Sequence, residues 1–179
     1  MSSQLALFPG NPIIKGADLS DCGRYRYELT RQWDQDGPLI EFIMLNPSSA
    51  DAEVDDPTIR RIIGSEKRPG FARQWGYGRA VVRNLYAYRA THPEELVNVD
   101  DPVGPRNREY LSRDDADCTI VAWGADPAAE GWWNGYPFGW QPSVIQRRAL
   151  FCLGTNANGS PKHPLYVRAD RTPTRWEAP

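Results

Sequence analysis

The chain has 179 residues, of which 40% are hydrophobic and 25% are charged. These proportions exclude a disordered or fibrous protein, and the length suits one domain that buries about two-thirds of its unfolded surface. No apolar run approaches the roughly 18 residues that a membrane span needs. The N-terminus lacks the basic and then apolar segments of a secretion signal. We therefore expect a cytoplasmic protein without a membrane partner.

The distribution of charge is more informative than the formal net charge of −2. Arginine makes up 18 of the 21 basic residues, and its planar guanidinium suits phosphate and carboxylate groups. Eight basic residues and one acid, Glu66, lie from Arg60 to Arg89, whereas ten acids lie from Ala90 to Glu130. Two interpretations are open: solvated helix faces, or one positive face that binds an anionic ligand.

Few residues suggest a metal site. The three cysteines show no CxxC spacing, which argues against zinc or a redox pair. Asp51, Asp55 and Asp56 carry the oxygen ligands that Mg²⁺ prefers. Asp56 stands just before Pro57, however, and this order is typical of a capped helix start. We expect no metal and no cofactor, and keep a metal-dependent hydrolase as a third possible function.

Apolar periodicity and turn residues predict the following elements along the chain. Residues 1–20 are expected to form an irregular N-terminal arm, and residues 21–179 a single α/β domain. Strands are expected at residues 24–29, 39–45, 80–85, 119–123 and 150–153. Helices are expected at residues 57–63, 71–75, 104–115 and 143–149. This alternation predicts a three-layer α/β/α fold with a mainly parallel central sheet.

Polar loops follow four of the predicted strands. They begin at Asn46, Asn84, Gly124 and Gly154, and the last one reaches His163-Pro164. Ligands of open parallel sheets bind outside the carboxyl ends of the strands. We therefore expect the four loops to converge on one crevice that offers amides, hydroxyls and a histidine.

Six runs of the sequence carry a family resemblance. They are residues 42–53, 55–61, 71–78, 84–91, 122–125 and 158–166. Together these runs resemble a bacterial and phage family known only as domain-of-unknown-function family 1643, over about residues 24–168. The resemblance implies membership of that family, whose name carries no activity.

A more distant resemblance concerns the ends of the strands. Four motifs occur there in this order: Asn46-Pro47, Asn84, Trp123-Gly124 and His163-Pro164. The order is similar to that in the uracil-DNA glycosylase superfamily, and it implies a uracil-DNA glycosylase-like fold. Two positions depart from that pattern, because the superfamily usually has glycine at Met44 and often has serine at Leu165.

The second resemblance implies roles for the crevice residues. Negative charge develops on a base as it leaves a sugar, and a histidine aimed at the base carbonyl stabilises that charge. His163 would take this catalytic role, and Asn46 would position the attacking water. Substrate binding is expected from Pro47, Ser48, Ser49, Arg60, Arg61, Asn84, Arg89, Thr91, Trp123 and Gly124.

Besides the metal-dependent hydrolase, two functions remain open on the sequence alone. The first is a protein that binds a nucleotide, or a base in DNA or RNA, and cleaves or processes its N-glycosidic bond. The alternative is a non-catalytic nucleotide or nucleic-acid binding module. Residues 132–140 hold five aromatic side chains, which could stack on bases or pack into the protein's own core.

Overall fold

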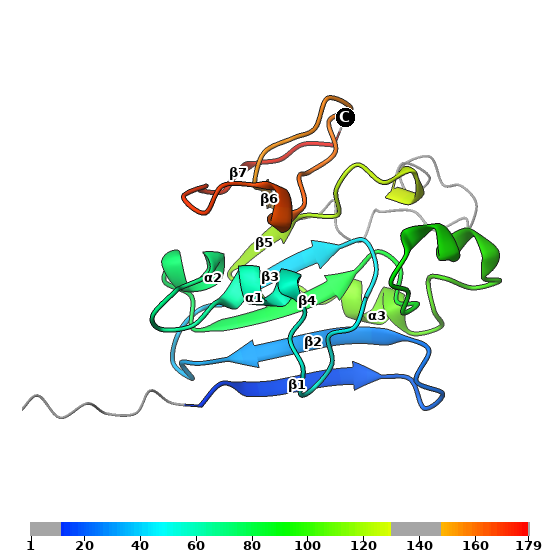
Figure 1. The fold of residues 1–179 in the computed structure, drawn as a ribbon, viewed down its shortest axis with the longest axis horizontal. Helices are drawn as coiled ribbons and strands as arrows, with labels where there is room; N and C mark the ends of the chain where they lie inside the picture. The colour runs from blue at the N-terminus through cyan, green and yellow to red at the C-terminus, as the bar shows by residue number, and fades with distance from the viewer. Residues whose placement is uncertain (1–11, 130–147, 179) are drawn as a thin grey trace, which may run out of the picture.

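The computed structural model describes residues 12–129 and 148–178, and Figure 1 shows its fold. Within these described residues, seven strands form one sheet in the order β1-β2-β4-β3-β5-β6-β7. Their bounds are β1 Ile14–Leu19, β2 Arg26–Gln32, β3 Leu39–Met44, β4 Arg79–Asn84, β5 Cys118–Val121, β6 Leu150–Cys152 and β7 Thr174–Arg175. The expected aromatic segment at 132–140 lies outside the described residues.

The helices are short. The bounds are α1 Pro57–Ile63, α2 Phe71–Gln74, the 3-10 helix η1 Pro93–Asn98, α3 Asn107–Leu111 and the 3-10 helix η3 Pro164–Tyr166. The predicted start of α1 is confirmed, because the Asp56 carboxylate accepts a hydrogen bond from the backbone N–H of Ile59 at 2.8 Å. None of the helices within 12–129 and 148–178 is long and apolar enough to cross a membrane.

Glycine ends α1 for two reasons. Gly64 has a φ of 61°, a conformation that side chains rarely adopt. A Cβ atom there would also lie 2.2 Å from the backbone nitrogen of Gly70. The chain therefore turns sharply at Gly64 and passes close to itself before α2 begins.

The sheet is mixed. The four strands β4, β3, β5 and β6 run parallel to one another, whereas β1, β2 and β7 add to the two edges in antiparallel pairs. The α/β class is therefore confirmed, but three of the six pairings are antiparallel, so the sheet as a whole is not mainly parallel. The alternation of strands and helices predicts the parallel centre, because parallel neighbours need a crossover connection. It does not predict the edges, because antiparallel neighbours need no helical crossover.

Three other expectations need correction. Residues 14–19 form β1 and are not part of an irregular arm, because each of them pairs with β2. The helix expected at 104–115 is limited to α3. Of the helix expected at 143–149, residues 143–147 lie outside the described part and residues 148 and 149 are not helical.

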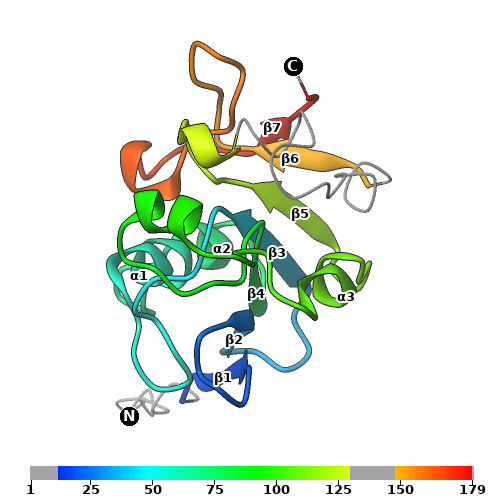
Figure 2. The same cartoon turned by 90° about the vertical axis from the view of Figure 1, so that its right-hand side faces the viewer.

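The two faces of the sheet carry different helices, as Figure 2 shows. Side chains alternate along a strand, so neighbouring residues of β3 point to opposite faces. Phe42 packs with Ile62 of α1 and Phe71 of α2, whereas Ile43 packs with Leu111 of α3. Both faces of the central strands are thus buried.

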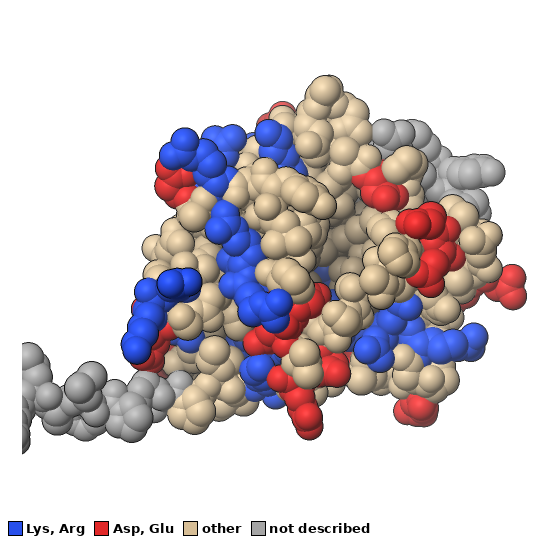
Figure 3. All heavy atoms as spheres, in the orientation of Figure 1, with Lys and Arg blue, Asp and Glu red and all other residues tan. Residues whose placement is uncertain are grey.

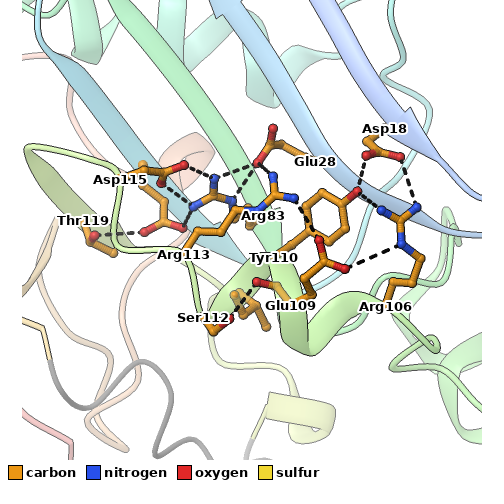
Figure 4. A network of polar contacts seen from close by, with 12 residues as sticks. Asp18, Glu28, Arg83, Arg106, Glu109, Tyr110, Ser112, Arg113, Asp115 and Thr119 are labelled. Carbon is orange, nitrogen blue, oxygen red and sulfur yellow. Dashed lines mark hydrogen bonds and ion pairs between the residues drawn. The ribbon is translucent and has the colours of Figure 1, made fainter.

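A buried network of charges lies on the α3 face of the sheet (Figure 4). The guanidinium of Arg83, on β4, is 1% exposed and bonds to carboxylates of Glu28 at 2.7 Å, Glu41 at 2.9 Å and Asp115 at 2.9 Å. Glu41, on β3, is fully buried and also accepts hydrogen bonds from Thr119 at 2.9 Å and Arg148 at 2.6 Å. The network therefore joins β2, β3, β4 and β5 at one level of the sheet.

Breaking this network should unfold the protein more easily. Arg83→Met removes the cation that Glu41 and Glu28 share and leaves them with Arg148 and Arg113 alone. Removing one partner from a buried ion pair costs about 3–5 kcal/mol. Urea denaturation should show a loss of that size in the free energy of unfolding. The matched control is Arg168→Met, which breaks an ion pair between side chains that are 87% and 67% exposed. Equal losses in the two variants would contradict a structural role for the network.

Candidate functional site

A cavity of about 540 Å³ opens at the carboxyl ends of the parallel strands. Residues from all four expected regions line it, including Asn46, Thr91, Gly124 and His163. Figure 3 shows the hollow on this face of the molecule, between basic side chains over α1 and acidic side chains over η1. The predicted convergence of the strand-end loops is therefore confirmed.

Hydrogen bonds between backbones join these loops in pairs. The N–H of Ala90 donates to the carbonyl of Pro47 at 2.9 Å, which joins the loop after β3 to the loop after β4. The N–H of Gly124 donates to the carbonyl of Pro161 at 2.9 Å, which joins the loop after β5 to the loop after β6. The walls of the cavity are thus connected to one another as well as to the sheet.

The cavity brings together seven of the residues expected in the site. They are Asn46, Ser48, Asn84, Thr91, Trp123, Gly124 and His163.

Five expected residues do not line the cavity. Pro47 is buried beside it and Ser49 faces solvent. The three arginines bond to backbone carbonyls instead: Arg60 to Asp55, Arg61 to Val167 and Arg89 to Gly23. A hydrogen bond from a guanidinium to a backbone carbonyl cannot be recognised from the sequence. These arginines were therefore expected to bind substrate.

The sequence analysis missed four functional candidates that line the cavity. They are Arg26, Asp56, Asp126 and Tyr166. The only signal for Tyr166 was its place in the run 158–166, three residues after His163. Its side chain is 82% exposed at the rim, with its ring 5.5 Å from that of His163.

Arg26 reaches the cavity because β2 contains a bulge. Asp18 pairs with Glu28 and Leu19 with Arg26, so Tyr27 has no partner in β1. The extra residue turns Tyr27 to the α3 face, where it stacks on Tyr110 at 5.2 Å. Arg26, which alternation would place on the face that Glu28 shares, instead lies on the opposite side beside the cavity.

Arg26 determines the orientation of the Asn84 amide. Arg26 is 3% exposed, and its guanidinium donates to the carbonyl of Ala50 at 2.8 Å and to Oδ1 of Asn84 at 3.1 Å. A guanidinium can only donate, so the Asn84 atom facing it must be the oxygen. Nδ2 of Asn84 has no hydrogen-bond partner among the described residues and remains a donor for a ligand. Burial lowers the pKa of Arg26 to about 10, against the effect of Asp56, so it stays charged at neutral pH.

The Asn46 amide has the opposite polarity. Its Nδ2 donates to the carbonyl of Ala90 at 2.8 Å and to that of Pro47 at 3.1 Å. Its Oδ1 accepts no hydrogen bond within the described ranges. Asn46 therefore offers the cavity an acceptor, the group needed to orient a water molecule.

His163 offers a second donor. Its Nδ1 accepts from the backbone N–H of Leu165 at 3.3 Å, so in the neutral ring the proton is on Nε2. Burial lowers the pKa of His163, although the negative charge of Asp56 acts in the other direction. The imidazole is therefore neutral at pH 7, with Nε2–H as the donor.

The carboxylates considered for Mg²⁺ bind other groups of the protein. Asp55 forms ion pairs with Arg31 at 2.7 Å and Lys15 at 2.9 Å. Asp51 accepts from the backbone N–H groups of Glu53 and Val54. Among residues 12–129 and 148–178, no three His, Cys, Asp or Glu side chains are grouped so that they could hold a metal ion.

Comparison with known proteins assigns a family. The model of the family described as "Protein of unknown function (DUF1643)" matches residues 26–165. The chain belongs to this family. The DUF1643 match runs from Arg26, at the bulge, past His163, so it includes both donors and the Asn46 acceptor. No curated protein and no solved structure matches the chain.

The protonation of His163 can be measured directly. We expect ¹⁵N NMR titration to give His163 a pKa below the ordinary histidine value of about 6.5, since burial disfavours the charged ring. Above that pKa, the ¹⁵N shifts should show the proton on Nε2. The chain has two histidines, and the variant His92→Asn assigns the signals. A raised pKa, or a proton on Nδ1, would contradict the donor assigned to this ring.

Proposed function

We propose that the chain binds the base of a nucleotide or nucleic acid in this cavity and cleaves its N-glycosidic bond. The observation that supports this function best is the fixed polarity of three side chains in one cavity: Asn46 offers an acceptor, and Asn84 and His163 offer donors. Each polarity is set by a neighbouring group of the protein, so a ligand meets a preorganised site.

The position in the sheet supports binding. β3 lies between β4 and β5, so the chain leaves β3 toward one side of the sheet and later returns to its other side. Ligands of open α/β sheets bind at such a switch point. We also propose that the fold is the uracil-DNA glycosylase-like three-layer arrangement, on the basis of the parallel strands β4-β3-β5-β6 with α1 and α2 on one face and α3 on the other.

The size and walls of the cavity suit a base. A volume of about 540 Å³ lies within the range of about 300–1,000 Å³ that small-molecule sites occupy. Nδ2 of Asn84 can donate to an acceptor on the base edge. Trp123 lines the cavity and is braced edge-on by Trp176 at 5.3 Å. Tyr166 presents an exposed ring at the rim, where a base could stack.

The proposed chemistry follows from these polarities. As the bond between the base nitrogen and C1′ of the sugar breaks, its electron pair leaves with the base. The Nε2–H of His163 donates to a base carbonyl and stabilises the negative charge that develops there, without giving up its proton. A water molecule, oriented by Oδ1 of Asn46, adds its oxygen to C1′. An amide is a poor base, so the water proton passes to a carboxylate lining the cavity, Asp56 or Asp126, or to solvent.

One observation favours the alternative, a binding module without catalysis. Basic side chains gather over α1 beside the hollow (Figure 3). Such a surface attracts a polyanion whether or not any bond is cleaved. Binding of this kind would weaken steeply with salt and give no product.

The catalytic roles predict a clear outcome in a panel of nucleotides and modified-base oligonucleotides. His163→Ala removes the donor to the leaving base, and loss of one such donor lowers kcat by about 10²–10³-fold. Asn46→Ala should also slow base release, because the water loses its acceptor. The controls are His92→Asn and Asn98→Ala, whose side chains are exposed and do not line the cavity.

Two results would overturn parts of this proposal. Base release at the wild-type rate in both cavity variants would show that the assigned roles are wrong. Salt-sensitive binding with no base release from any substrate would favour the non-catalytic module.

A further inference from the structure

A second hollow lies directly beside the cavity. It has a volume of about 460 Å³ and is formed by the segment from Lys162 to Thr172. Tyr166 lines both hollows, and Lys162 immediately precedes His163 of the cavity. A ligand seated in the cavity would therefore have this second hollow as its neighbour.

The lining of the second hollow is mainly cationic. Lys162, Arg168 and Arg171 contribute three positive charges, whereas Asp170 contributes one negative charge. Arg168 forms two hydrogen bonds with Asp170, at 2.8 and 3.1 Å. Within the described part of the chain, neither Lys162 nor Arg171 forms an ion pair with a carboxylate. Two cations are thus available to an anionic group.

The protein holds Arg171 in place from one side. Its Nε donates to the backbone carbonyl of Leu153 at 3.0 Å. Its guanidinium also packs over Gly154, where a Cβ atom would lie 3.0 Å from Nη2. Gly154 has a φ of 109°, a backbone conformation that favours glycine, and a Cβ atom there would also push the Arg171 guanidinium aside. These contacts occupy Nε and leave the Nη donors for a ligand.

The floor of the second hollow is joined to α1. Nη2 of Arg61 donates to the backbone carbonyl of Val167 at 2.6 Å. This bond occupies a guanidinium that was expected to bind substrate, and it positions the loop that carries Arg168 and Arg171. The anion-binding groups therefore come from the C-terminal loop and not from the arginines of α1.

We infer that the second hollow binds a phosphate group of the ligand whose base enters the cavity. The inference rests on the proposed function and narrows it to phosphorylated ligands, either a free nucleotide or the phosphodiester of a strand. The Nη donors of Arg171 suit two phosphate oxygens at once, and the ammonium of Lys162 adds a point charge. A free base or an unphosphorylated nucleoside would leave this site unused.

The test compares matched ligands on matched variants. Calorimetry gives Kd for four nucleosides, their 5′-monophosphates, inorganic pyrophosphate and a short single-stranded oligonucleotide. The variant is Lys162→Gln/Arg171→Gln. Its control is Lys67→Gln/Arg108→Gln, which removes the same charges from exposed residues that line neither hollow. Lys162→Gln alone keeps the test valid if the double variant misfolds, since the Lys162 ammonium makes no described contact within the protein.

A monophosphate should bind the wild type at least about tenfold more tightly than its nucleoside. The double variant should lose this difference and keep the nucleoside Kd, whereas the control should keep both. The salt dependence of monophosphate binding should also fall in the double variant. Tighter binding of the oligonucleotide than of any monophosphate would assign the phosphate to a strand, and the reverse would assign it to a free nucleotide.

Other results separate the two proposals. Equal Kd values for nucleoside and monophosphate in the wild type would overturn the phosphate site and leave the base site standing. No nucleoside binding, with phosphate-bearing probes still held through Lys162 and Arg171, would overturn the base site alone. Failure of every phosphate-bearing probe to bind, or binding that ignores both substitutions, would overturn this inference.

Discussion

The site depends on one buried cation, the guanidinium of Arg26. A charge removed from water must be hydrogen-bonded, and the acceptors within reach are the Ala50 carbonyl and Oδ1 of Asn84. These two bonds connect β2 with the loop after β3 and with the end of β4. They also leave the Asn84 amide with only its donor side for a ligand. The same contact that binds one end of the buried guanidinium therefore sets which group Asn84 offers to a ligand.

Arg83 precedes Asn84 in β4 and stabilises the opposite face of that strand. Because side chains alternate along a strand, Arg83 enters the ionic network on the α3 face while Asn84 lies beside the cavity. The network keeps β4 in place against β2, β3 and β5, and so keeps Asn84 opposite Arg26. Paired loops around the cavity add to this rigidity, which lowers the conformational entropy that the protein must lose when a ligand binds.

The sequence predicted that the loops converge on one site better than it predicted which residues line that site. Asn84 ends an apolar strand, and Asn46 and His163 lie in loops that follow other apolar strands. Parallel strands bring their carboxyl ends to one edge of the sheet. Arg26 could not be found in this way, because the bulge that redirects it depends on how β2 pairs with β1. β1 itself was missed because Pro9-Gly10 and Pro12 dominate the beginning of the chain and hide a strand that pairs only at the edge. The true partners of Arg60, Arg61 and Arg89 are backbone carbonyls, which no residue pattern reveals.

We propose that Asn46, Asn84 and His163 act on one ligand with fixed polarities. The most direct test is a nucleotide titration followed by ¹H–¹⁵N NMR of the side-chain amides and the imidazoles. The Asn46, Asn84 and His163 signals should shift together with one Kd, while those of Asn98 and His92 stay unchanged. In Arg26→Lys, the Asn84 signal should no longer shift with the other two, because the orientation of its amide is no longer held. Shifts confined to residues outside the cavity, or separate Kd values for the three side chains, would contradict the claim.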